Sequence, residues 1–349
     1  MAHFTCKKER FGLLSDGHKV HLYTISNGKM TVSVTDYGCT LTSIRLPAKR
    51  GTSVDVLLGY SSLDGYINST CCFGPAVGRF ANRISGAAFT LDGIKYELDK
   101  NDNGKNMLHG GFDRWEKKVW KAKKIHTENG MGVQFKRTSR DGEQGFPGTL
   151  KVCVTYTLSD DNVLALDYVA TTDKATPLNI TNHAYFNLKG HNGGSIFDQE
   201  LHLDCSHYLE VDDELIPTGE QIAVTGTPFD FTKGKLIGRD IEAAGGGYDH
   251  CFCLAKPSKT GDLVPFATLK DPESGRQMHV ATNQPGVQFY SANFIEGEKG
   301  KEGVEYHKHG GLCLETQGYP DAPNRPQFPS CILRPGETYH HRTTYGFVF

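Results

Sequence analysis

Long apolar runs are absent from this sequence. The runs that exist are short, as at residues 54–58, and none approaches the roughly 18 residues that a membrane-spanning helix needs. Residues 1–8 also hold no apolar segment of the kind found in secretory signals. These absences predict a cytoplasmic protein without a membrane partner.

An excess of charge of one sign is absent too. Lys and Arg total 38 against 40 Asp and Glu, a formal net charge of −2, and the charges are scattered along the chain. Proteins that bind nucleic acid or anionic membranes generally concentrate basic residues. We therefore expect no nucleic-acid partner.

Cysteine pairs and cofactor motifs are scarce. The ten cysteines include no Cys-x-x-Cys, and the close histidine pairs His307/His309 and His340/His341 have no partners at zinc-site spacing. Glycine-rich phosphate loops, Gly-x-Ser-x-Gly and His-Glu-x-x-His are also missing. The sequence therefore predicts no disulfide scaffold and no metal site, and it gives no support for nicotinamide, ATP or serine-hydrolase chemistry.

Glycine, in contrast, is abundant. Forty of the 349 residues are glycine, above the usual share of about 7%. Between the turns, apolar and polar residues alternate, as in strands. Asn27-Gly28 and Asp92-Gly93 each separate two alternating segments, a pattern that predicts tight hairpins. Further alternating segments occupy residues 150–156, 164–170 and 339–347.

No stretch of twelve residues carries the apolar stripe of an amphipathic helix, and no linker, repeat or shift in composition divides the chain. We therefore predict an all-β fold. Its expected form is a single large antiparallel β-sandwich with few short helices, built by one domain over residues 1–349.

Residues 178–188 form the most informative segment. Read as one strand, it places Asn179, Thr181, His183, Tyr185 and Asn187 on one face. Strand faces exposed to water more often carry Lys, Glu and Thr. We interpret this face as the floor of a polar cleft with a functional His183; an ordinary exposed strand is the alternative.

A carboxylate stands in a second apolar strand, residues 311–319. Glu315 shares one face with Cys313 and Gln317, while leucines take the other face. Burial of a charge costs several kcal/mol unless the group is paired or neutralised. Glu315 is therefore either a structural carboxylate or a functional one.

Other polar segments are weak signals alone but resemble a known family together. They are Gly-Arg-Phe-Ala-Asn-Arg-Ile (78–84), Asn-Met-Leu-His-Gly-Gly (106–111), Tyr-Asp-His (248–250) and Pro-Gly-Val-Gln-Phe-Tyr (285–290). With residues 179–188 and Leu-Glu-Thr-Gln (314–317), they resemble, in order, the motifs of the aldose 1-epimerases, or galactose mutarotases. The resemblance extends over nearly the whole chain.

The resemblance implies a large β-sandwich that holds a sugar in an open cleft, with no metal or cofactor. It implies Glu315 as general base, His183 as general acid and His109 as an assisting group near the ring oxygen. The residues implied to bind the sugar are Asn82, Arg83, Tyr185, Asp249 and Gln288. The implied substrate is an aldohexose, galactose or glucose, bound by a monomer or homodimer.

These residue types suit the exchange of anomers. A base must remove the proton of the anomeric hydroxyl while an acid protonates the ring oxygen. An ionised Glu315 and a His183 with an ordinary pKa of about 6.5 would supply both near neutral pH. This pairing predicts a bell-shaped pH dependence, with Glu315 governing the acid limb and His183 the alkaline limb.

Alternative functions stay open at this point. A glycoside hydrolase would use Asp249 and Glu315 as its two carboxyl groups. A non-catalytic sugar-binding sandwich would need no paired Glu and His. A phosphosugar epimerase would require a basic cluster for the phosphate, which the sequence does not reveal.

Overall fold

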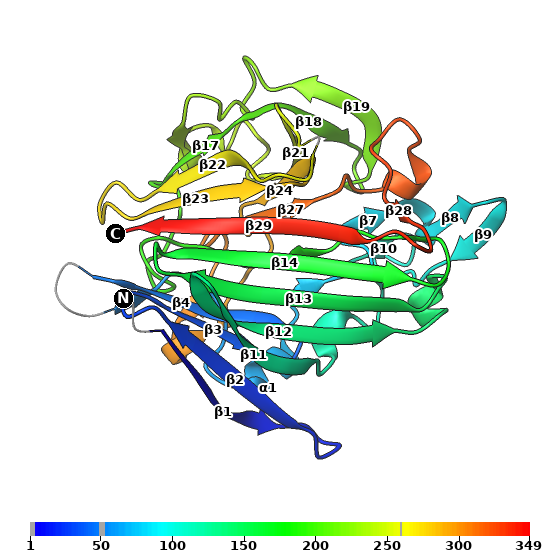
Figure 1. Cartoon of the computed structure of the whole chain (residues 1–349). Coiled ribbons are helices and arrows are strands. Elements are labelled where there is room, and N and C mark those ends of the chain that lie inside the picture. Colours follow the sequence, from blue (N-terminus) through cyan, green and yellow to red (C-terminus); the bar gives the residue numbers. More distant parts are fainter. Residues whose placement is uncertain (1–3, 49–52, 259) are drawn as a thin grey trace.

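The structure is a computed structural model that describes residues 4–48, 53–258 and 260–349. Three sheets dominate this part of the chain (Figure 1). The largest has nine strands among the described residues, in the order β11-β12-β13-β14-β29-β23-β22-β17-β20. Its strands are β11 (Lys121–Thr127), β12 (Gly130–Ser139), β13 (Leu150–Ser159), β14 (Val163–Thr172), β29 (Tyr339–Val348), β23 (Gln277–Thr282), β22 (Val264–Lys270), β17 (Glu200–Leu203) and β20 (Lys235–Leu236).

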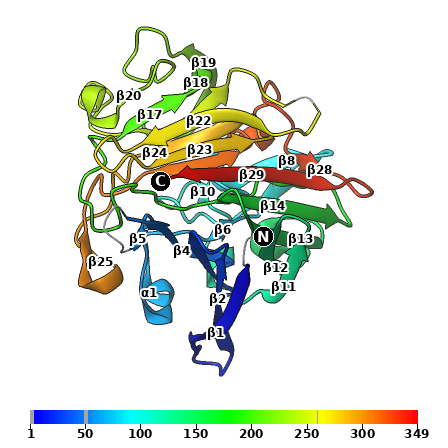
Figure 2. The ribbon, with the colours of Figure 1, turned by 60° about the vertical axis from the view of Figure 1, so that its left-hand side comes forward.

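Two five-stranded sheets complete the main framework of the described chain. The first contains β1 (Thr5–Leu13), β2 (Lys19–Ser26), β3 (Thr31–Thr35), β4 (Thr40–Pro47) and β5 (Ser53–Asp55) in sequence order. The second has the order β19 (Pro217–Ala223), β18 (Cys205–Val211), β21 (Asp249–Leu254), β24 (Gly286–Tyr290) and β27 (Cys313–Gln317). Figure 2 shows β1, β2 and β4 below β29, and β17, β18, β19 and β22 above it.

Short strand pairs lie outside these three sheets. They are β6 (Ala76–Val77) with β16 (Thr181–Asn182), β7 (Arg83–Ile84) with β10 (Met107–Leu108), β8 (Ala88–Leu91) with β9 (Ile94–Glu97), β15 (Thr176–Pro177) with β28 (Ile332–Leu333), and β25 (Glu298–Lys299) with β26 (Glu305–Tyr306).

Helical structure is sparse. Within residues 4–48, 53–258 and 260–349, α1 (Leu63–Asn68) is the one α-helix. Short 3-10 turns occur at Ser85–Ala87, Trp115–Lys117, Glu143–Gly145, Ile237–Asp240, Lys301–Gly303 and Ala322–Asn324. None of the helices in the described segments has the length and hydropathy to cross a membrane.

One hydrophobic core joins the three sheets. Val32 of β3, Val154 of β13 and Leu314 of β27 are all buried in it. In β13 every second side chain, from Leu150 to Leu158, is buried, and the removal of this apolar surface from water stabilises the packed sheets by roughly 25 cal/mol per Å². The predicted all-β antiparallel sandwich is therefore confirmed.

The predicted hairpins are also confirmed. Asn27-Gly28 joins β2 to β3, and Asp92-Gly93 joins β8 to β9. Gly28 and Gly93 adopt positive φ angles of 84° and 79°, which a residue without a Cβ reaches at no steric cost. These turns fix the strand registers on either side.

The prediction of one continuous strand over residues 178–188 is wrong. Only Thr181–Asn182 forms a strand, β16, with isolated bridges elsewhere. The segment runs between neighbouring elements, and some of its polar side chains bond backbone carbonyls of other segments. The Thr181 hydroxyl donates to Thr316 O at 2.9 Å, and the Asn187 amide donates to Gly194 O at 2.8 Å.

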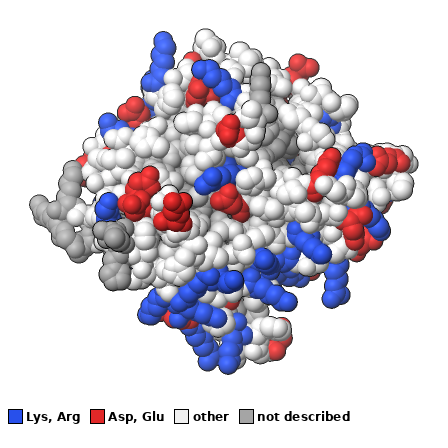
Figure 3. All heavy atoms as spheres, viewed as in Figure 1, with Lys and Arg blue, Asp and Glu red and all other residues white. Residues whose placement is uncertain are grey.

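Basic side chains gather on two edge strands. Lys and Arg cluster over β1, β2 and β11 in the lower part of Figure 3. β1 and β11 lie at the edges of their sheets and carry exposed cations such as Lys8, Lys121 and Lys123. Lysine on an edge strand discourages pairing with another chain, so this distribution protects the open sheet edges.

Candidate active site

One pocket of about 230 Å³ collects the polar segments noted in the sequence. It is lined by Thr70, Cys71, Cys72, Asn82, Arg83, Leu108, His109, Arg114, His183, Tyr185, Asp249, Gln288, Tyr290, Phe294, Ile295 and Glu315. Every residue proposed for the site from the sequence lies on this wall, including His183 and Tyr185 from the segment that is not one strand. The pocket thus brings together residues that are up to 245 positions apart (Thr70 and Glu315).

Three neighbouring strands build one wall. Gln288 of β24 lies opposite Glu315 of β27, and Tyr290 lies opposite Asp249 of β21. Side chains at directly opposed positions share a sheet face. The Gln288 amide donates to Asp249 Oδ1 at 2.7 Å, so the sheet register itself aligns the carboxyl groups along the pocket.

His183 follows β16, and its ring is held on several sides. Its backbone N–H donates to Pro75 O at 3.1 Å. The ring stacks on Tyr185, with centroids 5.1 Å apart, and meets His109 edge-on at 5.2 Å. Its Nε2 lies 3.6 Å from Glu315 Oε1. The candidate acid and the candidate base therefore face each other within the pocket.

His109 is fixed in one tautomer by the backbone. The Asn82 N–H donates to His109 Nδ1 at 3.2 Å, and the His109 N–H donates to Asn82 O at 3.2 Å. A ring nitrogen that accepts a hydrogen bond carries no proton, so the proton of neutral His109 is on Nε2. Both residues have left-handed backbones, with φ of 67° and 53°, a conformation that costs energy in residues other than glycine.

Burial governs the carboxyl groups. Glu315 is 2% exposed, and burial together with Asp249 raises its pKa well above the usual range, while Arg83 acts in the opposite direction. Burial also raises the pKa of Asp249, against the effects of Arg83 and Gln288. Both carboxyl groups thus favour the neutral form more strongly than they would in water.

Burial has the matching effect on the histidines. Burial lowers the pKa of His183 to about 4, and the positive charge of Arg114 lowers it further. A hydrogen bond between the ring and the backbone of His183 acts in the opposite direction. The pKa of His109 is held well below its usual value by burial, by His183 and by Arg114. Both rings are consequently neutral at pH 7.

These directions differ from the charge states expected from the sequence. An ionised Glu315 facing a protonated His183 was predicted, whereas burial favours a protonated Glu315 and a neutral His183. Both arrangements hold one proton on the pair, so they are two forms of one coupled system.

Unpaired polar atoms complete the site. Glu315 Oε2 and Gln288 Oε1 are buried and have no hydrogen-bond partner among the described residues. A buried polar atom without a partner costs about 1–3 kcal/mol. A ligand rich in hydroxyl groups would supply donors to both atoms.

The sequence did not single out all of the wall. Arg114, Cys71 and Phe294 were missed, although they line the pocket. Arg114 lies five residues after His109 in an ordinary loop and carried no recognisable signal. Tyr290 could have been found, because it ends the 285–290 motif. It stands two positions after Gln288 in β24, so both side chains lie on the same face of the strand.

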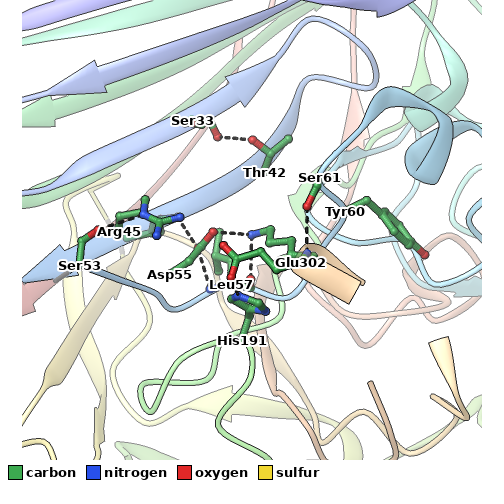
Figure 4. A network of polar contacts seen from close by, with 12 residues as sticks. Ser33, Thr42, Arg45, Ser53, Asp55, Leu57, Tyr60, Ser61, His191 and Glu302 are labelled. Carbon is green, nitrogen blue, oxygen red and sulfur yellow. Dashed lines mark hydrogen bonds and ion pairs between the residues drawn. The ribbon is translucent and has the colours of Figure 1, made fainter. Parts of the chain in front are cut away.

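A buried ion pair anchors the segment that carries Phe294 and Ile295. Lys301 Nζ lies 2.8 Å from Asp55 Oδ2 and donates to Leu57 O at 2.9 Å. Figure 4 shows His191 and Glu302 close to Asp55, the carboxylate of this pair. The contact joins Lys301, six positions after Ile295 of the pocket wall, to the end of β5.

Three ligand-type side chains adjoin the pocket. His183, Cys313 and Glu315 each offer an atom within 4.8 Å of the others. However, Nδ1 of His183 faces Cys313 Sγ at 3.5 Å, while Nε2 faces Glu315. A metal ion uses one ring nitrogen at about 2.0–2.1 Å, so this divided arrangement suits a hydrogen-bonded chain better than a metal centre.

Comparison with known proteins agrees with this geometry. Residues 21–346 match the sequence profile of the Aldose 1-epimerase family. The chain is 45% identical over 340 residues to galactose mutarotase of Rattus norvegicus, covering 97% of each chain. It is 38% identical over 344 residues to aldose 1-epimerase of Escherichia coli (strain K12), covering 96% of this chain and 97% of that one.

A solved structure shares the whole fold. Galactose 1-epimerase from Lactobacillus acidophilus NCFM superposes with a TM-score of 0.85 at 26% identity, and the match covers 99% of both chains. The motifs, the sandwich and the sequence matches therefore lead to one conclusion: the chain belongs to the aldose 1-epimerase family.

Proposed function

We propose that this chain interconverts the α and β anomers of a free aldohexose, galactose or glucose. It is an isomerase of the aldose 1-epimerase family. In the proposed mechanism Glu315 is the base, His183 is the acid, and His109 assists at the ring oxygen. Asn82, Arg83, Tyr185, Asp249 and Gln288 hold the hydroxyl groups of the sugar.

The reaction moves two protons and breaks one ring bond. Glu315 removes the proton from the anomeric hydroxyl, and the C1–O5 bond breaks as His183 delivers a proton to O5. The open aldehyde rotates about C1–C2. The ring then closes on the other face of C1: His183 takes back the proton from O5, and Glu315 returns its proton to the new anomeric hydroxyl. Each proton transfer contributes typically 10²–10⁴-fold to the rate.

The coupled pair supplies the required proton. Exchange of one proton between Glu315 and His183 converts the neutral pair into the ionised Glu315 and protonated His183 that ring opening uses. Arg83 favours the ionised form of Glu315. Hydroxyl groups of a bound sugar that donate to Glu315 Oε2 would favour it further.

The charges of the pocket favour a sugar without phosphate. Arg83 Nε is paired with Asp102 Oδ2 at 3.0 Å, and Arg114 is paired with Glu116 at 2.5 Å. Asp249 and Glu315 add two acidic groups. Because both arginines are already paired with carboxylates, a phosphate group would meet no unpaired Lys or Arg among the described residues that line the pocket, which argues against a phosphosugar epimerase.

One observation carries the proposal: Glu315 Oε1 and His183 Nε2 lie 3.6 Å apart in a pocket lined by hydrogen-bonding side chains. Polarimetry of freshly dissolved α-D-galactose and α-D-glucose tests it. The protein should accelerate the approach to the equilibrium rotation in proportion to its concentration. Uncatalysed rates with both sugars would refute the proposal.

The alternatives have distinct outcomes in parallel assays. A glycoside hydrolase would release reducing sugar from an aryl galactoside, and we expect none. A non-catalytic module would bind galactose without changing the rate of anomer exchange. Neither alternative finds support in the similar proteins, which are named mutarotases and epimerases.

A further inference from the structure

The Nδ1 side of His183 has an unusual partner. Nδ1 lies 3.5 Å from Sγ of Cys313, a fully buried residue two positions before Glu315. Cys313 is not part of the pocket wall. Burial and the nearby Glu315 raise the pKa of the Cys313 thiol well above 9, so the sulfur keeps its proton at neutral pH.

In two other histidines, His109 and His341, Nδ1 contacts a backbone group of a distant residue. Nδ1 of His109 accepts from the Asn82 N–H, and Nδ1 of His341 lies 2.9 Å from Ile180 O. Each of these contacts fixes one tautomer. A thiol is both a weak donor and a weak acceptor, so the sulfur beside Nδ1 of His183 is a weaker acceptor than the Ile180 carbonyl beside Nδ1 of His341.

We propose that Cys313 is a positioning residue that keeps His183 a readily exchanging acid. The proposal rests on the proposed function above. Nε2 faces Glu315 and the pocket, so the proton that reaches O5 leaves from Nε2 and Nδ1 keeps its proton. The sulfur therefore accepts weakly from Nδ1–H in the protonated ring and in the neutral ring that remains. A strong acceptor at the same place would stabilise the protonated ring and hold back the proton that O5 needs.

The surroundings of His183 assign this role to the sulfur. The titratable and charged groups that face the ring are His109, Arg114, Tyr185, Tyr290, Cys313 and Glu315. Glu315 lies on the Nε2 side, and Tyr185 covers one face of the ring. Among the described residues, Cys313 is thus the side chain that contacts Nδ1.

Two substitutions should move the acid limb of the pH profile in opposite directions. Cys313→Asn places a carbonyl oxygen, a stronger acceptor, beside Nδ1. The pKa of His183 and the acid limb should rise by about one pH unit. Cys313→Ala removes the partner. The acid limb should move to lower pH, and kcat at pH 7 should fall about tenfold, less than the 10²–10⁴-fold effect of losing the acid itself.

Anomer exchange with galactose gives kcat and KM at each pH, and NMR titration of the His183 ring gives its pKa directly. KM should change less than twofold in both variants. Cys253→Ala is the matched control, because Cys253 is a buried cysteine of strand β21 in the same sheet and does not line the pocket. It should leave the acid limb in place.

The outcomes separate this inference from the proposed function. If the unmodified protein catalyses exchange but both Cys313 variants keep its acid limb and its ring pKa, the inference is wrong and the function stands. If Cys253→Ala matches Cys313→Ala in kcat and ring pKa, the effect is one of packing, which also overturns the inference. If the unmodified protein does not exchange anomers, the proposed function itself fails. Cys313→Ala alone decides the question if Cys313→Asn does not fold.

Discussion

His341 offers a quantitative test of how burial affects the protonation of a histidine in this fold. Its side chain is fully buried on β29 and stacks on Tyr168 with ring centroids 4.6 Å apart. Nδ1 lies 2.9 Å from Ile180 O, and Nε2 lies 3.0 Å from the Thr316 hydroxyl. The carbonyl accepts from Nδ1–H, so Nε2 accepts from the hydroxyl and the ring is neutral. Protonation would break this arrangement.

The size of the effect follows from the pKa of His341, which burial lowers from 6.5 to about 3. The unfolded chain binds a proton near pH 6.5 and the folded chain only near pH 3. The contribution of His341 to stability is therefore complete above pH 6.5 and is lost progressively as the pH falls toward 3. Between pH 7 and pH 5 the loss from this residue is about 2 kcal/mol.

Urea denaturation at pH 7 and pH 5 measures this loss. The free energy of unfolding of the unmodified protein should fall between the two pH values, with His183 and His250 contributing in the same direction. In His341→Gln the fall should be smaller by about 2 kcal/mol, whatever the stability of this variant at pH 7. An equal fall in both proteins would refute the reasoning.

Further predictions concern the ion pair and the pH profile. Lys301→Met should lower the free energy of unfolding, measured in urea, by about 3–5 kcal/mol, because it leaves Asp55 buried without its cation. The control Lys299→Met changes an exposed side chain and should have little effect. Equal losses in the two variants would contradict the account. Anomer exchange should show a bell-shaped pH dependence whose acid limb, near pH 4, reports His183 and whose alkaline limb reports Glu315. This assignment of the limbs is the reverse of the one expected from the sequence. A flat profile from pH 3 to 9 would count against the pair. Asp249→Asn should move the alkaline limb to lower pH, because Asp249 raises the pKa of Glu315, and it should raise KM for galactose; an unmoved limb would argue against this coupling.

Local signals in the sequence predicted the fold well. Alternation and the turns at Gly28 and Gly93 depend on neighbouring residues, so they identified β2, β3, β8 and β9 directly. The segment 178–188 failed because its path depends on distant partners. The Thr181 hydroxyl bonds Thr316, which is 135 positions away, and no local pattern encodes such a contact.

For the site, too, local signals could be read from the sequence and contacts between distant residues could not. His183 and Glu315 could be singled out because their residue types are unusual in the strand patterns that the sequence predicts, and the family resemblance added the rest of the predicted set. Arg114 stands in a loop and gave no such conflict. The protonation states were also beyond the sequence, because the pKa directions of Glu315 and His183 arise from burial by many distant residues.

The central claim is that Glu315 and His183 exchange protons with one bound aldose. Anomer exchange of galactose at equilibrium, measured by NMR for the unmodified protein and for Glu315→Gln, tests it most directly, with galactose binding followed by calorimetry. We predict that Glu315→Gln lowers the exchange rate by about 10²–10⁴-fold while galactose still binds. Unchanged exchange in a variant that binds galactose normally would contradict the claim.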